Sequence, residues 1–442
     1  RDAAMQGRTA TLASKTAIST TWSMTTGLDY TPKSFIVTLL ANDGTYYVSE
    51  VLAAVVSSGT ALQALNVTNA GIRISNPDEF ALLGDSEKKD KDFALSSDID
   101  LADSGAWDGP DGYSGHFYGN GYTITGLVLD KTGGDTGLFD KVSDGAVIQD
   151  FTVVVSTKLP VEARTAASHF GGVVGLVNGS ATIWVKDVQV KGTLDYGPVN
   201  VTNCFLLAGG IIGEISPGSD VTLERCVTNI NISLDAGNVI GGGFTLGFGG
   251  LVGKAFSTLN IKQCYAAGNI MLNHNASKTL IAGGLVGQKY GGSLTIEESY
   301  ASGNIIAKNI YGSNNQNIIA AGLLGDATSS PNITIRKSAA LNEKVLAITG
   351  SSYSKSGRLV GMANGTATYQ NNRARLDMYT GYTDEGTLND ASGSLTTVAG
   401  LGTSLEDFKL KATWTTGSDG LAWDETVWDF SGLSQGKWPT LK

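Results

Sequence analysis

Two hydrophobic patterns recur along this chain. The first is a unit of the form Gly-Gly-aliphatic-aliphatic-Gly. From the third copy onward, except the last, a segment of alternating apolar and polar residues such as Leu259–Cys264 follows 6 to 8 residues later. Such alternation is typical of a β-strand with one buried face. The copies, some degenerate, are Thr136–Asp140, Gly171–Gly175, Gly209–Gly213, Gly249–Gly253, Gly283–Gly287, Ala321–Gly325 and Gly357–Gly361.

Successive units end 34 to 40 residues apart, a period typical of repeat proteins. A third segment opens with a Gly-Asn pair, at Gly268-Asn269 and Gly303-Asn304, and both residue types tolerate the positive φ that a corner requires. Three short strands per repeat, with no helical period between them, describe one coil of a parallel β-helix. We therefore predict an all-β, single-stranded parallel β-helix.

Stacked coils would place equivalent residues roughly 4.8 Å apart, side chain over side chain, where like charges repel. Two columns within the alternating segment come directly after its two apolar residues, and neither column brings like charges together. We interpret them as a structural ladder in register. The first column is Lys186, Glu224, Lys262, Glu297 and Arg336, and the second is Asp187, Arg225, Gln263, Glu298 and Lys337. The repeat glycines are predicted to be structural as well: Gly172, Gly175, Gly210, Gly213, Gly250, Gly253, Gly284, Gly287, Gly322 and Gly325.

A column of small residues lies beside the charges and fits an inward corner: Cys226, Cys264, Ser299 and Ser338. Stacked parallel positions have poor disulfide geometry, so we favour buried free thiols over a bond between the two cysteines. With Cys204 the cysteine count is odd, and the spacing matches neither a disulfide framework nor a metal site.

Both ends of the chain depart from the repeat, and we divide it into residues 1–70, 71–382 and 383–442. Asn76 followed by Pro77 predicts a helix to about Leu83 that covers the first coil. Before it, 34–49 read as a β-hairpin that belongs to a small domain or extends the solenoid. Four of the seven tryptophans lie in the last 30 residues, which predicts a cap on the final coil or, less favoured, a ligand platform.

The segment from Phe93 to Leu127, with Asp98-Ile99-Asp100-Leu101 and Gly119-Asn120-Gly121, resembles the opening of GLUG-repeat bacterial surface proteins. The Phe-x-Gly start of that pattern is Tyr113-Ser114-Gly115 here, and Gly-Leu-Phe-Gly ends in Asp140. The ending Trp438–Leu441 is similar to the family's terminal Tyr/Trp-Pro-x-Leu. The resemblance spans about 72–442 and implies a right-handed β-helix, export, and surface attachment or adhesion. It implies no catalytic residues, because the repeat accompanies proteases and adhesin-like proteins alike.

Composition narrows the possible partners. Charged residues are only 16% of the chain, and a net charge of −10 argues against nucleic acid. No stretch of about 20 apolar residues is present, so we predict no membrane span. The chain begins with Arg, and we expect that a leader peptide has been removed.

Candidate chemistry is sparse in the sequence. The column after the glycine unit holds Glu214 and Asp326, three coils or roughly 14 Å apart, too far for an acid–base pair. The three histidines, His116, His169 and His274, have no cysteine or serine partner at useful spacing. A structural calcium site is a less favoured alternative for the acidic residues Asp98, Asp100, Asp103, Asp108 and Asp111. We therefore predict that the chain is not an enzyme and needs no cofactor or metal.

These observations predict a non-catalytic, exported protein at the cell surface or outside the cell, associated with the outer membrane. Its solenoid would serve as an adhesion or binding scaffold for a host or bacterial glycan or protein, as a monomer. Two alternatives remain open: a carbohydrate-binding or polysaccharide-processing β-helix, and a stalk for another domain. Exposed aromatic rows would favour glycan binding, and a featureless Ser/Thr/Asn face would favour a stalk.

Overall fold

The computed structural model describes most of the chain from residue 70 onward and short segments before it. The described residues are 33–35, 38–40, 45–49, 52–54, 70–131, 134–158, 168–202, 205–240, 245–274, 279–309, 317–329, 332–349, 354–364, 366–388, 394, 397–417 and 420–442. All contacts and absences given below refer to these residues.

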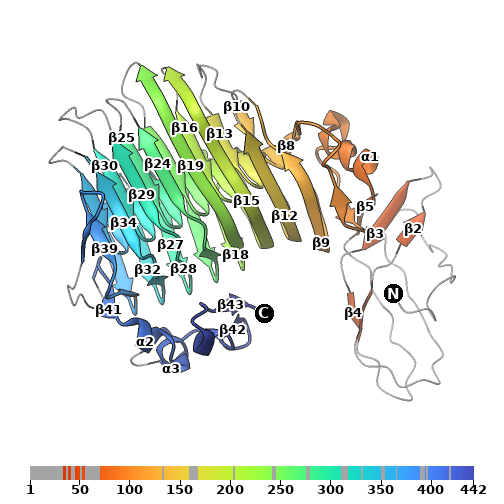
Figure 1. The fold of residues 1–442 in the computed structure, drawn as a ribbon. Coiled ribbons are helices and arrows are strands. Elements are labelled where there is room, and N and C mark those ends of the chain that lie inside the picture. The colour runs from red at the N-terminus through yellow and green to blue at the C-terminus, as the bar shows by residue number, and fades with distance from the viewer. Residues whose placement is uncertain are drawn as a thin grey trace, which may run out of the picture.

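The prediction of a parallel β-solenoid is confirmed (Figure 1). Each coil contributes strands to three parallel sheets. Sheet A contains β10 (Gly134–Thr136), β13 (Ser168–Gly171), β16 (Leu206–Gly209), β20 (Thr245–Gly249), β25 (Thr279–Gly283), β30 (Ile318–Ala321) and β35 (Lys355–Gly357). Sheet B contains β8 (Asp111–Tyr113), β11 (Phe139–Val142), β14 (Val174–Val177), β17 (Ile212–Ile215), β21 (Val252–Ala255), β26 (Val286–Lys289), β31 (Leu324–Ala327) and β36 (Val360–Ala363).

Sheet C is the broad third side of the solenoid. Its first strands are long: β9 (His116–Val128), β12 (Val147–Lys158), β15 (Ile183–Thr202) and β19 (Val227–Ile240), with the short β18 (Val221–Glu224) beside them. Later coils divide this side into shorter strands: β22 (Leu259–Lys262), β23 (Tyr265–Ala266), β24 (Ile270–His274), β27 (Ser293–Glu297), β28 (Tyr300–Ala301), β29 (Ile305–Asn309), β32 (Asn332–Arg336), β33 (Ala339–Ala340), β34 (Lys344–Ile348), β37 (Thr366–Gln370), β38 (Arg373–Arg375) and β39 (Tyr379–Gly381).

One apolar core runs through the coils because each strand turns alternate residues inward. Ile183, Val221, Leu259, Leu294 and Ile333 illustrate this, since they stack in register and are at most 2% exposed. Full burial of such a side chain contributes roughly 1.5–3 kcal/mol. The repeated inward position therefore supplies the main driving force for stacking.

The second glycine of each unit is required by the next coil. A Cβ on Gly210, Gly250 or Gly284 would lie 1.9–2.2 Å from the carbonyl oxygen of the equivalent glycine one coil further on. These glycines do not have positive φ, so the requirement is space rather than backbone freedom. The last unit carries Arg358 at this position, where its guanidinium donates to the carbonyl of Ala374 at 3.0 Å. The exception falls on the terminal copy of the repeat.

The fifth glycine faces the previous coil instead. A Cβ on Gly213 would lie 2.6 Å from the backbone nitrogen of Phe170, and one on Gly325 would lie 2.7 Å from Cγ2 of Ile281. The outer face of sheet A in one coil therefore lies against the outer face of sheet B in the next. We call the space between these two outer faces the crease. In the first unit this glycine is replaced by Asp140, which pairs with Lys131.

The corners with positive φ do not lie where the sequence suggested. Neither Gly268 nor Gly303 has a positive φ, so that expectation is wrong. The asparagines beside them form a ladder instead, in which Oδ1 of Asn231 accepts from the backbone N–H of Asn269, and Oδ1 of Asn269 accepts from that of Asn304. The left-handed residues include the whole second charged column, with φ of 48–56°: Asp187, Arg225, Gln263, Glu298 and Lys337.

The N-terminal end follows the predicted pattern. The helix α1 (Pro77–Phe80) is capped by Asn76, whose side chain accepts from the backbone N–H of Glu79, and η2 (Ala81–Gly84) continues it. Phe80 and Leu83 enter the core and cover the first coil. The short η3 (Ser86–Lys88) and the strands β6 (Phe93–Leu95) and β7 (Ile99–Asp100) follow.

The predicted N-terminal hairpin is present as β2 (Thr38–Leu40) and β3 (Tyr46–Ser49), which pair antiparallel. The strand β3 also pairs with β5 (Ala70–Ile74), and β5 pairs in parallel with β6, so the hairpin extends sheet C. A further antiparallel pair joins β1 (Lys33–Phe35) and β4 (Leu52–Ala54). The turn at 42–44 and residues 1–32 lie outside the described residues.

The C-terminal segment comprises β40 (Thr387–Leu388), β41 (Leu401–Thr403), α2 (Leu405–Phe408), α3 (Lys411–Thr415), β42 (Trp428–Asp429), η4 (Leu433–Gln435) and β43 (Thr440–Leu441). Its aromatic cluster packs on the flank of the coils, against Tyr300 and Ala339, rather than over the open end of the last coil. Trp423 donates from Nε1 to the carbonyl of Lys337 at 2.6 Å, and the Tyr300 hydroxyl donates to the carbonyl of Pro439 at 2.7 Å. Figure 1 shows this dark-blue segment below the coils.

Candidate functional site

The two charged columns lie in register from coil to coil. Lys186 lies opposite Glu224, and Lys262 lies opposite Glu297. Arg225 makes two bonds to Asp187, at 2.6 and 2.7 Å, and Arg336 lies 2.7 Å from Glu297. In the second column Gln263 donates to Glu298 at 2.9 Å, and Lys337 lies 3.3 Å from the same carboxylate. Because these charges meet one another, they do not form a cluster directed at a ligand.

The cysteine column belongs to the frame as well. Cys226 and Cys264 are buried free thiols, as predicted, while Cys204 lies outside the described residues. The Sγ of Cys264 accepts from the backbone N–H of Cys226 at 3.3 Å, and the Ser299 hydroxyl accepts from that of Cys264 at 3.1 Å. Burial raises the pKa of the Cys264 thiol well above its ordinary value. The column therefore satisfies backbone donors at the corner.

The crease holds a second row of charges at its N-terminal half. The Nδ1 of His169, on β13, lies 2.5 Å from Oδ1 of Asp135, on β10. The Nε2 of the same ring lies 3.7 Å from Oε2 of Glu214, on β17. The amino group of Lys141 lies 3.3 Å from Asp135 and 3.1 Å from Asp111. One imidazole is thus held between two carboxylates that come from different coils.

Burial sets the electrostatics of this group, since the side chains of Asp135, His169 and Glu214 are only 12–14% exposed. Burial raises the pKa of Glu214, and the nearby His169 and Lys254 offset this only in part. Burial also raises the pKa of Asp135, but the bonds from His169 and Lys141 outweigh it, and its net shift is downward. The arrangement provides a carboxyl group with an increased affinity for a proton beside an imidazole whose other nitrogen is engaged.

The row continues to Lys254, which lies one coil beyond Glu214 on β21. Its amino group lies 4.4, 5.2 and 5.5 Å from the ring centres of Phe256, Tyr290 and Phe205, within the range of cation–π attraction. Burial lowers the pKa of Lys254, and Glu214 and Asp326 oppose this shift. The Phe256 and Tyr290 rings are 5.2 Å apart, and Tyr290 is 47% exposed. We call His169, Glu214, Lys254, Phe256 and Tyr290 the crease site.

This site was not predicted from the sequence. In the sequence Glu214 belongs to the column after the glycine unit, and His169 has neither a serine nor a cysteine at useful spacing. The partners of His169 are carboxylates instead. A signal was available in the column of sheet A, where its equivalents in the following coils are Leu207, Gly247, Ile281 and Ile319.

The remaining predicted candidates are separate. Glu214 and Asp326 stay in different coils, and Asp326 accepts from Gln288 at 3.1 Å. The ring of His116 lies 2.9 Å from the Tyr118 hydroxyl, and the side chain of His274 lies outside the described part. Asp98 accepts from the backbone N–H of Thr123. Among the described residues, the His, Cys, Asp and Glu side chains form no group of three or more suited to a metal ion.

Comparisons with known proteins assign the chain to no family. No family model matches it. A curated protein named halomucin, from Haloquadratum walsbyi (strain DSM 16790 / HBSQ001), is 25% identical over an alignment of 247 residues, and the match covers 49% of this chain and 2% of that protein. The chain therefore spans a very small part of that relative.

Two solved structures have a similar outline. One is described as "a putative immunoglobulin A1 protease" from Bacteroides ovatus, with a TM-score of 0.48 and 16% identity, covering 84% of this chain and 92% of that one. The other is named IgA1 Protease, with a TM-score of 0.43 and 14% identity, covering 77% of this chain and 25% of that one. Likeness at this level carries no residue roles to the present chain.

These names correct one prediction. We expected from the sequence that the chain is not an enzyme, but both solved structures of similar outline carry the name of a protease. The exclusion of catalysis is therefore withdrawn.

Within the part of the chain that the structure describes, no helix has the length and apolar character to cross a membrane.

Proposed function

We propose that this chain is a glycan-binding module of an exported surface protein and that the crease site contacts the glycan. The observation that carries the proposal is the pair of aromatic rings at Phe256 and Tyr290, in adjacent coils, beside a buried cation. Aromatic side chains with an exposed face provide flat apolar area with little entropy to lose on binding.

Adhesion is the biological role that such a module would serve. The resemblance to GLUG-repeat surface proteins supports this role, as does the limited likeness to the protein named halomucin. Repetition also favours it, because a solenoid presents equivalent side chains at each coil to a polymer that lies along it. The stalk alternative is weaker, since the described surface includes exposed aromatic rings.

The test is a glycan array probed with the whole chain, followed by titration of any glycan that binds. We expect Tyr290→Ala to weaken binding by about tenfold or more, the loss of roughly 1.4 kcal/mol. Tyr382→Ala is the matched control, because Tyr382 is 48% exposed and lies outside the crease site. Equal affinity of the Tyr290 variant and the wild type would exclude the crease site as the contact surface.

A second candidate function is proton transfer on a bound acidic glycan. It is favoured by His169, which Asp135 holds at Nδ1 while Nε2 faces Glu214. In a β-elimination, His169 would take the proton beside the sugar carboxylate, and the electron pair would form a carbon–carbon double bond. The glycosidic carbon–oxygen bond would break, Glu214 would give its proton to the leaving oxygen, and Lys254 would balance the carboxylate charge. The step requires neither water nor a cofactor.

The double bond of the product absorbs ultraviolet light, so the reaction can be followed directly with polyuronate as the probe. We expect His169→Gln to abolish the absorbance increase while leaving binding within about threefold, because the aromatic contacts remain. An increase that survives both His169→Gln and Glu214→Gln would contradict the assignment.

A further inference from the structure

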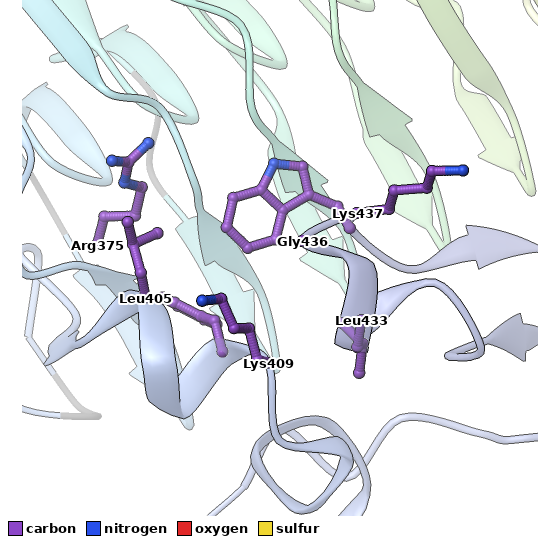
Figure 2. A pocket seen from close by; sticks show the side chains of 8 residues that line it. Arg375, Leu405, Lys409, Leu433, Gly436 and Lys437 are labelled. Atoms are coloured by element: carbon purple, nitrogen blue, oxygen red, sulfur yellow. The ribbon is translucent and has the colours of Figure 1, made fainter.

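A cavity of about 230 Å³ lies between the coils and the C-terminal segment. Figure 2 shows Arg375, Leu405 and Lys409 along one side and Leu433, Gly436 and Lys437 along the opposite side. Phe408 and Trp438 complete the lining. The volume is below the roughly 300–1,000 Å³ of sites for drug-sized ligands, so it suits a single ring-sized group.

The apolar part of the lining contains the one C-terminal tryptophan that stays accessible. Trp414, Trp423 and Trp428 are at most 2% exposed and hold the segment on the flank of the coils, whereas Trp438 is only partly buried. Phe408 packs edge-on against Trp438, with ring centres 6.0 Å apart and an angle of 84°. This contact fixes the indole in place. The three buried tryptophans thus attach the segment to the flank of the coils, and Trp438 alone among the C-terminal tryptophans keeps part of its surface accessible.

The charged part of the lining has one sign. Arg375, Lys409 and Lys437 line the cavity and no carboxylate does, although the chain has 41 acidic and 31 basic residues. Asp377 holds the Arg375 guanidinium through Nε and Nη2, at 2.9 and 2.7 Å, and these two bonds leave Nη1 for another acceptor. Chain-wide charge therefore gives no reason for this local excess of cations.

The ammonium groups of Lys409 and Lys437 are not strongly engaged by carboxylates of the chain, so they can bind an anionic ligand. Lys409 lies 2.6 Å from Glu406, whose side chain is 81% exposed, and an ion pair so exposed contributes little. Lys437 forms no ion pair with any residue that the structure describes. Ammonium and guanidinium groups beside an apolar floor match a ligand that combines a carboxylate with an apolar ring face.

We propose that this cavity binds the carboxylate-bearing sugar residue of an acidic glycan. The apolar face of the sugar ring packs on Trp438, and its carboxylate is held by the cations of the rim. The inference rests on the proposed glycan-binding function but uses a separate site, so it adds an end anchor to a polymer lying along the coils. A uronate within a polysaccharide and a terminal sialate share this chemistry.

The test uses isothermal titration of the whole chain with four probes: an oligogalacturonate, sialyllactose, neutral lactose and a poly-glutamate peptide. We expect at least one acidic sugar to bind and lactose not to bind. The double variant Lys409→Gln/Lys437→Gln should weaken the acidic probe by about tenfold or more, because it removes two charge-assisted contacts. Lys411→Gln is the control, since the Lys411 side chain is 54% exposed, against 43% for Lys409, but pairs with Glu425 outside the cavity. Whichever acidic probe binds identifies the source of the carboxylate.

Several outcomes would overturn the inference. These are equal binding of lactose, no binding of either acidic probe, unchanged affinity in the double variant, and preference for a poly-glutamate peptide over the acidic sugars. Tyr290→Ala measured with the same probes separates this inference from the proposed function. If Tyr290→Ala weakens glycan binding and the double variant does not, the crease site stands and the cavity does not. The double variant changes only surface charges, so a loss of folding does not obscure the result.

Discussion

The two halves of the crease have the same backbone geometry and opposite chemistry. In the C-terminal half, Ile281 and Ile319 of sheet A fill the space above the glycines of sheet B and are at most 2% exposed. In the N-terminal half the same column carries Asp135 and His169, and the His169 ring lies 3.7 Å from Glu214 across the crease. The backbone contact requires small residues in both halves, while the filling side chain is free to vary. A solenoid can therefore acquire a polar site in one or two coils without changing its frame.

The largest expected effect on stability comes from adding a side chain at a glycine of sheet B in the apolar half of the crease. In Gly325→Val the new Cβ would lie 2.4 Å from the carbonyl oxygen of Gly287 and 2.7 Å from Ile281, so two coils must separate. We expect a loss of more than about 4 kcal/mol in the free energy of unfolding, measured by urea titration. Gly417→Val is the control, because a Cβ at Gly417 meets nothing within 4 Å and should change stability by at most about 0.5 kcal/mol. Comparable losses in both variants would refute the account of the crease.

The second prediction compares the stability lost when the side chain that fills each half of the crease is removed. Ile281→Ala removes buried apolar volume and should cost about 2–4 kcal/mol. His169→Ala removes less apolar surface but leaves two carboxylates facing each other, and it should cost about 1–3 kcal/mol. The two losses should also respond differently to acid, because protonation of the carboxylates relieves only the His169 variant. Identical losses at pH 5 and pH 8 for His169→Ala would show that the ring acts by packing alone.

Asp140, in the first unit of the repeat, should make the stability of the folded chain depend on pH. Burial raises its pKa from 3.8 to about 6, with Lys131 opposing the shift. The folded state therefore holds a proton that the unfolded state has already lost, and wild-type stability falls as pH rises from about 4 to above 6. The linked change is up to about 3 kcal/mol. Asp140→Asn should remove this slope in urea titrations between pH 4 and pH 7, and an unchanged slope would place the proton elsewhere.

The frame of this fold could be predicted from sequence because its backbone contacts leave a compositional trace. A Cβ on Gly284 would lie 1.9 Å from the carbonyl oxygen of Gly322 in the next coil, so only glycine fits there, and the period becomes visible. The left-handed corner left no such trace. Arg225 and Glu298 occupy it with φ near 50°, although neither residue type favours that conformation. Its position could not be predicted from residue type.

Neither the crease site nor the packing of the C-terminal segment on the coils could be predicted by aligning equivalent positions of the repeat. The first depends on which outer faces of sheets A and B meet, a consequence of the turn angle at the glycine unit rather than of any residue pattern. The second depends on contacts such as Trp423 with Lys337, which join a unique segment to the repeat. Aligning the column that contains His169 would have shown Asp135 and His169 at positions where later coils carry Leu207, Ile281 and Ile319, but not the Glu214 that the ring faces.

The smallest effect should come from Glu214, and its sign distinguishes a site from a structural link. Burial raises the pKa of Glu214 above its ordinary value of 4.5, so the charged form is disfavoured in the folded state. The folded chain keeps this proton while the unfolded chain loses it, and the wild type therefore loses stability as pH rises above about 4.5. Glu214→Gln lacks this loss, so we expect it to be more stable than the wild type at pH 7, by less than the change at Asp140. A destabilised variant at pH 7 would mean that the carboxylate serves to hold the coils together. A stabilised one would mean that the chain retains a buried acid at a cost to its own stability, as a site that handles protons does.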